Sequence, residues 1–291
     1  MHSLRGSAFL ATLLIPLVCA LAPVAALHAE THVRIVTANL TSGNHQDYSP
    51  GHGARILQGL KPDIVLIQEF NIGDGSETAL RQWVNQTFGQ DFHVWREEQT
   101  GKGLPNGIIS RFPIISKGEW KDSEISNRDF AWAQLGLPGN RKLWAISVHL
   151  SHEDKKKRAA EAASLAKHIQ DEIPAEDLVV LGGDFNTKGR RETCIQNLSK
   201  VLETAAPYPV DDSGNETSNE VRKQPYDWLL ADKDLQALMV PVKVGEQKFA
   251  HGWVFDSHVV PDLTPLAPVQ ADDSHAKGMQ HLPIIKDFVL P

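Results

Sequence analysis

The sequence predicts an α/β domain built on mixed β-sheets. Short runs rich in β-branched residues alternate with amphipathic stretches early in the chain, and later give way to strands joined by long loops. A regular parallel barrel would not lose the alternation in this way. The 291 residues contain no internal repeat, low-complexity tract or convincing linker. We therefore expect residues 30–291 to form a single domain.

The expected strands and helices follow from hydrophobic periodicity. The strands span residues 33–38, 63–68, 107–110, 143–149, 178–183, 226–230 and 283–289. Between some of them, apolar residues recur at helical spacing after Asp74, over 162–173 and over 194–202. Ser151 and Asp154 are spaced like a capping pair ahead of the second of these helices.

Three further segments have simple structural interpretations. The polar stretch 211–224 is expected to be an exposed loop. The basic cluster at 155–158 opens a helix, and we interpret it as a solvated helix face rather than a binding patch. Cys194 lies in an apolar helical stripe, which predicts a core position.

Residues 1–29 have the layout of a secretory signal peptide. Arg5 precedes an apolar run over 8–26, which two prolines interrupt and which closes in small residues. A transmembrane anchor is the alternative, and the prolines and the small-residue end disfavour it. We expect cleavage after Ala26 or, preferably, Ala29, and export to a bacterial periplasm or the exterior. No later segment is long and apolar enough to span a bilayer.

Charge and cysteine content narrow the class of protein further. The formal net charge is −7, and losing Arg5 with the leader would make it −8. An acidic chain is not expected to hold nucleic acid by charge alone, although it can meet phosphate at a local metal or arginine site. Cys194 would be the one cysteine left, so no intrachain disulfide is possible. A secreted protein without disulfides must be stabilised by the size of its core.

Single polar residues recur at the ends of the expected strands. They are Asn39, Glu69, His149, Asp184, Asn186, Asp227 and His281, the last two lying just ahead of apolar runs. Strand ends are where layered α/β folds commonly present catalytic groups, and so many in one chain make coincidence a poor explanation. Carboxylates and amides offer the oxygen ligands that Mg²⁺ prefers, and two histidines can act as acid and base. No cysteine–histidine cluster indicates zinc, and no glycine-rich nucleotide loop is present.

In chain order these segments resemble a known superfamily. "TAN", "LIQE", "NGIISRFPI", "SVHL", "GGDFN", "YDWLL" and "QHLPI" are similar to motifs of the endonuclease/exonuclease/phosphatase superfamily. Its members include pancreatic-type deoxyribonuclease, exonuclease III, sphingomyelinases and inositol polyphosphate 5-phosphatases. The resemblance covers about residues 33–289. It implies a four-layer sandwich in which two mixed β-sheets face each other between helices, and metal-dependent hydrolysis of a phosphate ester.

The resemblance also implies where metal and phosphate would bind. Glu69 would ligate Mg²⁺, with Mn²⁺ as a possible substitute, and Asn39 would lie beside it near the phosphate. The segment "NRDFAWA" (127–133) is similar to one whose arginine contacts phosphate, which makes Arg128 a candidate. An ordinary loop arginine is the alternative interpretation of Arg128.

Catalytic roles follow from the same resemblance. Asp184 and Asn186 would orient the attacking water and the scissile phosphate. His149 would be a general acid or a donor to phosphate at the leaving group. His281, paired with Asp227, would be a general base or would stabilise the transition state. Which histidine acts as acid and which as base stays open.

Two positions depart from the family pattern. Gln280 stands where relatives commonly have an aspartate before the last histidine, and Thr41 where some have an acid. Fewer carboxylates predict weaker metal binding or reliance on one metal. Asp272 or Asp273 could take the place of the missing acid.

The sequence thus predicts a secreted, Mg²⁺-dependent phosphodiesterase, specifically a nuclease of low sequence specificity acting on nucleic acid without a stable protein partner. The first alternative is a sphingomyelinase-like or an inositol or sugar phosphate hydrolase. A lipid substrate would bring the enzyme to a membrane surface, where Trp253 and Phe255 could form an aromatic hairpin, although a buried strand is the favoured interpretation. The second alternative, motivated by Gln280, is a family member that binds phosphate compounds with weak or no catalysis.

Overall fold

The computed structural model describes residues 2, 30–44, 48, 51–98 and 103–290. Apart from residue 2, the leader expected over 1–29 lies outside the described residues. None of the helices described is long and apolar enough to cross a membrane.

Two β-sheets face each other across the centre of the fold. The first contains β1 (Thr31–Asn39), β2 (Ile64–Gln68), β3 (His93–Arg96), β4 (Gly107–Ser110), β10 (Met239–Val240), β13 (Trp253–Val254) and β14 (Ile284–Leu290). Their order is β10-β14-β1-β2-β4-β3, and β13 also pairs with β14. The second contains β5 (Ile114–Trp120), β6 (Phe130–Gly136), β7 (Lys142–His149), β8 (Leu178–Asp184) and β9 (Asp227–Ala231), in chain order. A separate hairpin joins β11 (Val242–Val244) to β12 (Gln247–Phe249).

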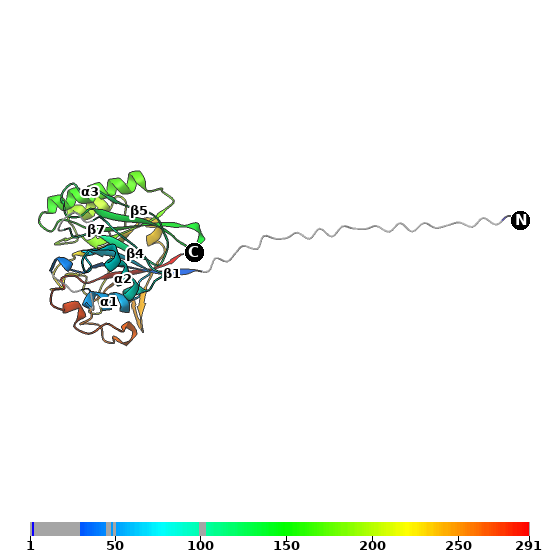
Figure 1. Ribbon diagram of the computed structural model, residues 1–291. Helices are drawn as coiled ribbons and strands as arrows, with labels where there is room; N and C mark the ends of the chain where they lie inside the picture. Colours follow the sequence, from blue (N-terminus) through cyan, green and yellow to red (C-terminus); the bar gives the residue numbers. More distant parts are fainter. Residues whose placement is uncertain (1, 3–29, 45–47, 49–50, 99–102, 291) are drawn as a thin grey trace.

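Helices cover the outer face of each sheet (Figure 1). α1 (His52–Leu60) and α2 (Glu77–Phe88) lie on the seven-stranded sheet, and α3 (Lys155–Glu172) and α4 (Thr193–Leu198) on the five-stranded sheet. The short α5 (Lys233–Gln236) follows β9. Four 3-10 turns complete the described elements: η1 (Ser42–Asn44), η2 (Pro138–Asn140), η3 (Thr264–Leu266) and η4 (Asp273–His275).

The strand pattern explains this layering, because successive side chains of a strand point to opposite faces. In β2, Ile64 and Leu66 pack into the core between the sheets, while Val65 and Ile67 pack against the helices. Strands buried on both faces read as continuous apolar runs, as β2 does. The two sheets and two helical layers form the four-layer sandwich that the family resemblance implies, so the predicted fold class is confirmed.

Two parallel crossovers determine where the polar strand ends meet. β1 runs parallel to β2 with Asn39 opposite Gln68, and α1 lies between them in the chain. β7 runs parallel to β8 with His149 opposite Asp184, and α3 lies between them. Since both pairs are parallel, each brings the residues after its two strands to one edge of its sheet.

Most of the expected elements form close to their predicted bounds. All seven expected strands are present, and the three expected helices are α2, α3 and α4. Asp154 caps α3 by accepting a hydrogen bond from the Lys156 amide, whereas Ser151 plays no such part. Cys194 is buried in the core, as predicted.

Two expectations about polar segments were wrong in part. The stretch 211–224 is not simply exposed, because Asp211, Ser218 and Asn219 are buried. Within the basic cluster at 155–158, Arg158 is also buried. Each of these buried polar groups has a hydrogen-bond partner, and polar composition alone cannot reveal that pairing.

Candidate active site

Strand register places three polar side chains side by side at one end of the five-stranded sheet. His149 of β7 pairs with Asp184 of β8, which in turn pairs with Asp227 at the start of β9. All three side chains are buried. The arrangement is rigid because each residue belongs to the hydrogen-bonded ladder of the sheet.

The residues that follow the strands adopt strained backbone conformations. Thr41, Glu69 and Asn186 have φ values of 59°, 54° and 53°, in the left-handed region that residues other than glycine seldom adopt. Such outliers persist only where the surroundings enforce them, and they cluster at functional sites. All three lie at the strand edge that carries the predicted site residues.

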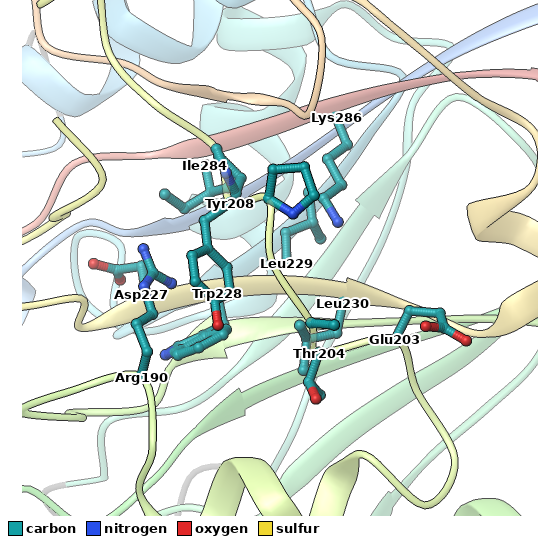
Figure 2. Close-up of a pocket in the computed structure, with 13 residues that line it drawn as sticks. Arg190, Glu203, Thr204, Tyr208, Asp227, Trp228, Leu229, Leu230, Ile284 and Lys286 are labelled. Atoms are coloured by element: carbon teal, nitrogen blue, oxygen red, sulfur yellow. The ribbon is translucent and has the colours of Figure 1, made fainter. Parts of the chain in front are cut away.

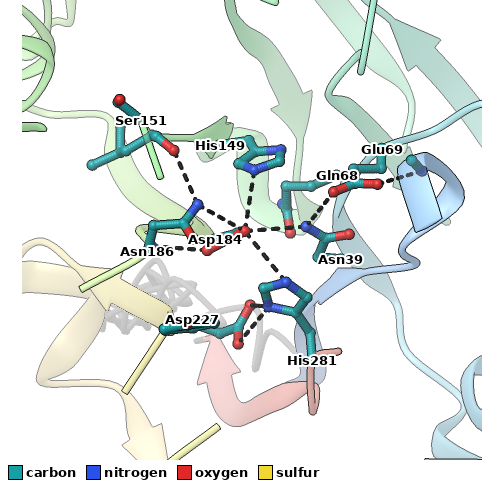
Figure 3. Close-up of polar contacts among 12 residues, drawn as sticks. Asn39, Gln68, Glu69, His149, Ser151, Asp184, Asn186, Asp227 and His281 are labelled. Carbon is teal, nitrogen blue, oxygen red and sulfur yellow. Dashed lines mark hydrogen bonds and ion pairs between the residues drawn. The ribbon is translucent and has the colours of Figure 1, made fainter. Parts of the chain in front are cut away.

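Asp184 is the centre of a hydrogen-bond network (Figure 3). Its Oδ2 atom lies 3.1 Å from His149 Nε2 and 3.4 Å from His281 Nε2. The same oxygen accepts hydrogen bonds from the side-chain amides of Asn39, at 3.2 Å, and Asn186, at 3.1 Å. Burial alone would raise the pKa of Asp184, but the neighbouring histidines and hydrogen bonds lower it well below its usual range. Asp184 is therefore ionised at neutral pH.

His281 lies between two carboxylates. Its Nδ1 atom is 3.1 Å from Asp227 Oδ1, and its Nε2 atom faces Asp184. Burial would lower the pKa of His281, yet the negative charges of Asp227 and Asp184 outweigh it and raise the pKa to about 10. His281 is consequently a protonated imidazolium at neutral pH.

His149 is in the opposite state. Burial and the positive charge of Arg128 lower the pKa of His149, and the attraction of Asp184 only partly offsets this. Because a carboxylate can only accept, Nε2 of neutral His149 carries the proton that faces Asp184. Its Nδ1 atom is buried and has no hydrogen-bond partner among the described residues. The site therefore combines one charged and one neutral histidine around a single aspartate.

Asn39 and Glu69 form the side of the site contributed by the seven-stranded sheet. The Asn39 side-chain amide donates to Glu69 Oε1 at 3.2 Å, as well as to Asp184. Glu69 Oε2 accepts a hydrogen bond of 2.6 Å from the Gly43 amide. Glu69 is only 7% exposed. A nearly buried carboxylate beside an amide oxygen supplies the hard oxygen donors that suit Mg²⁺ or Mn²⁺.

A second group also has the composition of a metal site. Asp184, Asp227 and His281 offer ligand atoms within 4.8 Å of one another, the one such compact trio among the described histidines, cysteines and acids. Both nitrogens of His281 face carboxylates, with Nδ1 3.1 Å from Asp227 Oδ1 and Nε2 3.4 Å from Asp184 Oδ2. In this arrangement the trio forms a charge network at the centre of the site.

Arg128 lies against the backbone that follows β7. Its Nε atom donates to the His149 carbonyl oxygen at 2.6 Å, and one terminal nitrogen donates to the Leu150 carbonyl oxygen at 3.3 Å. Arg128 is buried, which lowers its pKa. The structure thus brings together all eight residues singled out in the sequence, and Arg128 is adjacent to His149 rather than in an unrelated loop.

The departures from the family pattern are not compensated in the way the sequence suggested. Gln280 is exposed. Asp273 accepts hydrogen bonds from Arg55 and faces His52. If Asp273 moved to take the place of the missing acid, its ion pair with Arg55 would break. Asp272 is exposed and belongs to no metal-like group in the described part of the chain. The cation would depend mainly on Glu69.

Some supporting residues escaped the sequence analysis. Ser218 Oγ accepts a 2.7 Å hydrogen bond from the Asp227 amide, and Asn219 forms a β-bridge with His281. The ring of Tyr226 packs against His281 with centroids 5.6 Å apart. Ser218 and Asn219 lie in the stretch expected to be exposed, where no hydrophobic signal marks them. In the sequence, the only feature that marks Tyr226 is its position next to Asp227.

A small cavity lies behind Asp227 (Figure 2). Its volume is about 20 Å³, enough for one water molecule. The Arg190 guanidinium lies over the rings of Tyr208 and Trp228, 4.3 and 4.4 Å from their centroids. Burial lowers the pKa of Lys286, on the opposite wall, to about 8. This cavity is too small for a substrate, so its lining supports the strand that carries Asp227.

Aromatic exposure bears on the lipid alternative. Trp253 and Phe255 are both fully buried, and Trp253 belongs to β13. The favoured interpretation as a buried strand is confirmed for Trp253, and no aromatic hairpin projects at these two positions.

The chain is similar to a known protein family over much of its length. Residues 52–240, more than half of the chain, match the family described as "Endonuclease/Exonuclease/phosphatase family". No curated protein sequence matches the chain significantly.

Solved structures of similar fold cover most of the chain. A functionally unknown conserved protein from Enterococcus faecalis V583 has a TM-score of 0.61 and 15% identity, covering 88% of this chain and 99% of that one. An endonuclease/exonuclease/phosphatase from Bacteroides vulgatus has a TM-score of 0.59 and 16% identity, covering 89% and 99%. A mannosyl-6-phosphatase from Bacteroides thetaiotaomicron VPI-5482 has a TM-score of 0.57 and 14% identity, covering 89% and 100%. At these identities the likeness shows the fold alone.

Proposed function

The chain belongs to the endonuclease/exonuclease/phosphatase family, whose members hydrolyse phosphate esters, and on that premise we propose that it is a metal-dependent nuclease of low sequence specificity. The observation that carries the proposal is the position of ionised Asp184 between protonated His281 and neutral His149. A protein that only binds phosphate has no need for two histidines in opposite protonation states. We also propose that the protein is exported, on the strength of the leader-like residues 1–29.

Asp184 is suited to orient the attacking water. Its Oδ2 atom is surrounded by four donors. Its Oδ1 atom accepts a hydrogen bond from the backbone N–H of Asn186, at 2.8 Å. A carboxylate oxygen can accept more than one hydrogen bond, so Oδ1 can hold a water molecule as well. Asn186 fixes the direction of that carboxylate, and its side-chain amide also donates to the Leu150 carbonyl oxygen.

The two histidines supply different chemistry. The 3.4 Å contact between His281 Nε2 and Asp184 is long for a charge-assisted hydrogen bond, so this N–H can turn toward a phosphate oxygen. There the imidazolium would stabilise the negative charge of the transition state. Neutral His149 would act through its Nε2–H, which faces Asp184 and helps to hold the carboxylate that orients the water. A protonated resting state favours charge stabilisation over general base catalysis for His281.

Glu69 and Asn39 would hold the divalent cation, Mg²⁺ or Mn²⁺. Such an ion supplies Lewis-acid polarisation of a phosphoryl oxygen when it is bound. Asn39 has a second role that needs no ion, because its side-chain amide links Glu69 to Asp184.

Cleavage of supercoiled plasmid tests the proposed activity. The purified protein should nick the plasmid in Mg²⁺ or Mn²⁺ and not in EDTA, and Asp184→Ala and His281→Ala should each abolish nicking. A folded wild-type protein that leaves the plasmid intact in both metals would refute the nuclease proposal.

A sugar-phosphate hydrolase is the second candidate. It is favoured by the formal net charge of −7, which disfavours binding of a polyanion, and by the fold shared with a mannosyl-6-phosphatase. Release of inorganic phosphate from mannose 6-phosphate, without nicking of plasmid, would select this candidate. The buried Trp253 and Phe255 make a membrane lipid the weaker choice.

A further inference from the structure

A groove lies between the start of α3 and the loop that joins β8 to α4. Its volume is about 580 Å³. It is lined by Lys155, Lys156, Ala159, Gly189, Arg191, Glu192 and Thr193. These residues come from two segments that each begin shortly after a residue of the candidate active site. The loop follows Asn186, and α3 begins six residues after His149.

The groove is positively charged, although the whole chain is acidic. Lys155, Lys156 and Arg191 are all exposed. Glu192 is the one carboxylate of the lining, and Arg158 neutralises it through two hydrogen bonds of 2.9 and 2.8 Å. Three cations therefore face the groove without a free carboxylate in its lining.

The loop that carries Arg191 is held in place from both sides. The neighbouring Arg190 stacks on Tyr208 and Trp228 and donates to the Glu216 carbonyl oxygen at 2.5 Å. The Lys188 amide donates to Glu192 Oε1 at 2.6 Å. A fixed loop lowers the entropy lost when Arg191 meets an anion.

Lys188 connects this loop to the candidate active site. Its Nζ atom lies 2.9 Å from the Tyr226 hydroxyl and 4.2 Å from the ring centroid. Tyr226 in turn packs on His281. Lys188 therefore lies beside Tyr226 near the candidate active site, and the groove residues Gly189 and Arg191 follow it directly in the loop.

We propose that this groove binds the phosphate backbone of a nucleic-acid strand whose scissile phosphate lies at Asp184. The inference rests on the proposed nuclease function and adds the surface that selects a polymer over a small phosphate ester. Under this proposal the exposed Lys155 and Lys156 contact the phosphates, while the buried Arg158 braces Glu192.

Binding of a fluorescein-labelled single-stranded oligonucleotide in EDTA tests the proposal without turnover. The test variant is Lys155→Ala/Lys156→Ala/Arg191→Ala. The matched control is Lys142→Ala/Lys200→Ala/Lys248→Ala, which removes the same charge from other exposed positions. Fluorescence anisotropy at several salt concentrations gives the dissociation constant and its salt dependence, and thermal unfolding shows that both variants fold.

The test variant should bind about tenfold or more weakly than wild type. The slope of log affinity against log salt concentration should be shallower by about 1 for each phosphate that the variant no longer binds. Equal weakening in both triple variants would show a general charge effect and overturn the groove, and unchanged binding in the test variant would overturn it as well. Groove-dependent binding by a wild-type protein that does not cut plasmid would uphold the groove and refute the nuclease. Cleavage of plasmid by a protein whose binding does not depend on the groove would uphold the nuclease and refute the groove.

Discussion

The Nε2 atom of His281 lies 3.4 Å from the Oδ2 atom of Asp184, and this contact joins the two sheets of the sandwich. Asp184 ends β8 in the five-stranded sheet, whereas His281 precedes β14 in the seven-stranded sheet. Asn39, at the end of β1, makes a second link by donating to Asp184. The site is therefore complete only when the core between the sheets has formed.

The charge of His281 depends on Asp227, which makes the pH profile informative. The pKa of His281 is raised to about 10, so its imidazolium is lost only as pH rises through that value. Asp227→Asn removes the carboxylate that raises this pKa most, and the alkaline limb of kcat/KM should move to lower pH. Exposed Asp234→Asn is the control and should leave the limb in place. An unshifted limb in Asp227→Asn would contradict the assignment.

The same pKa makes folding stability pH-dependent. Protonated His281 is more favourable in the folded protein than in the unfolded chain, where its pKa is about 6.5. Its stabilising contribution is complete below that value and is lost as pH rises through about 10. The difference in the free energy of unfolding between wild type and His281→Gln should therefore shrink from pH 7 to pH 10. Urea titrations at several pH values measure it, and a constant difference would argue against a buried imidazolium.

Metal affinity should depend on Glu69. Glu69→Gln keeps the shape of the side chain but removes the charge that holds a divalent cation, so Mn²⁺ should bind on the order of tenfold to a hundredfold more weakly. Isothermal titration calorimetry of Mn²⁺ measures this directly. Exposed Glu77→Gln provides the control. Equal affinity in wild type and Glu69→Gln would move the metal site elsewhere.

The backbone beside Asp184 leaves no room for a side chain. A methyl group at Gly183 would come within 1.8 Å of the Val148 carbonyl oxygen, whereas one at Gly189 would meet no atom within 4 Å. Gly183→Ala should lower the free energy of unfolding by about 1–3 kcal/mol, the usual cost of overpacking, and should displace Asp184. Gly189→Ala should change stability by less than about 0.5 kcal/mol. Chemical denaturation of both variants compares them, and similar stabilities would show that the strand pair can separate at no cost.

Arg128 should be irreplaceable by lysine. Its planar guanidinium donates to two successive carbonyl oxygens, of His149 and Leu150, in a geometry that a single ammonium cannot match. Arg128→Lys should reduce kcat/KM about as much as Arg128→Ala, by roughly a hundredfold, because His149 is displaced. Arg141→Lys is the control. A near-normal kcat/KM in Arg128→Lys would show that the site needs only the positive charge of Arg128 and not its guanidinium geometry.

Much of the fold could be predicted because its central strands are continuous β-branched runs. β5 escaped prediction because Ile114–Trp120 is largely polar and lies at the edge of its sheet. β6 mixes alanines with larger residues, which suits close packing between sheets but weakens the β-branched signal. α1 contains two glycines, Gly53 and Gly59, which lower its helical signal.

The candidate site was predictable in its members but not in its electrostatics. Polar residues at strand ends marked positions such as His149 and Asp184, since parallel pairing brings those ends together. The opposite shifts in the pKa of His149 and His281 depend on Arg128 and Asp227, which lie far away in the sequence. Local pattern cannot reveal such contacts, and the same limit hid Ser218 beneath Asp227.

Hydrolysis of bis(4-nitrophenyl) phosphate tests the central claim, that Asp184 anchors metal-dependent cleavage of a phosphodiester. Release of 4-nitrophenol is measured for wild type and Asp184→Ala, each in Mn²⁺ and in EDTA, with near-ultraviolet circular dichroism to establish folding. We predict turnover by wild type in Mn²⁺ alone, and a loss on the order of a thousandfold or more in Asp184→Ala. Turnover by folded Asp184→Ala at the wild-type rate, or by wild type in EDTA, would contradict the claim.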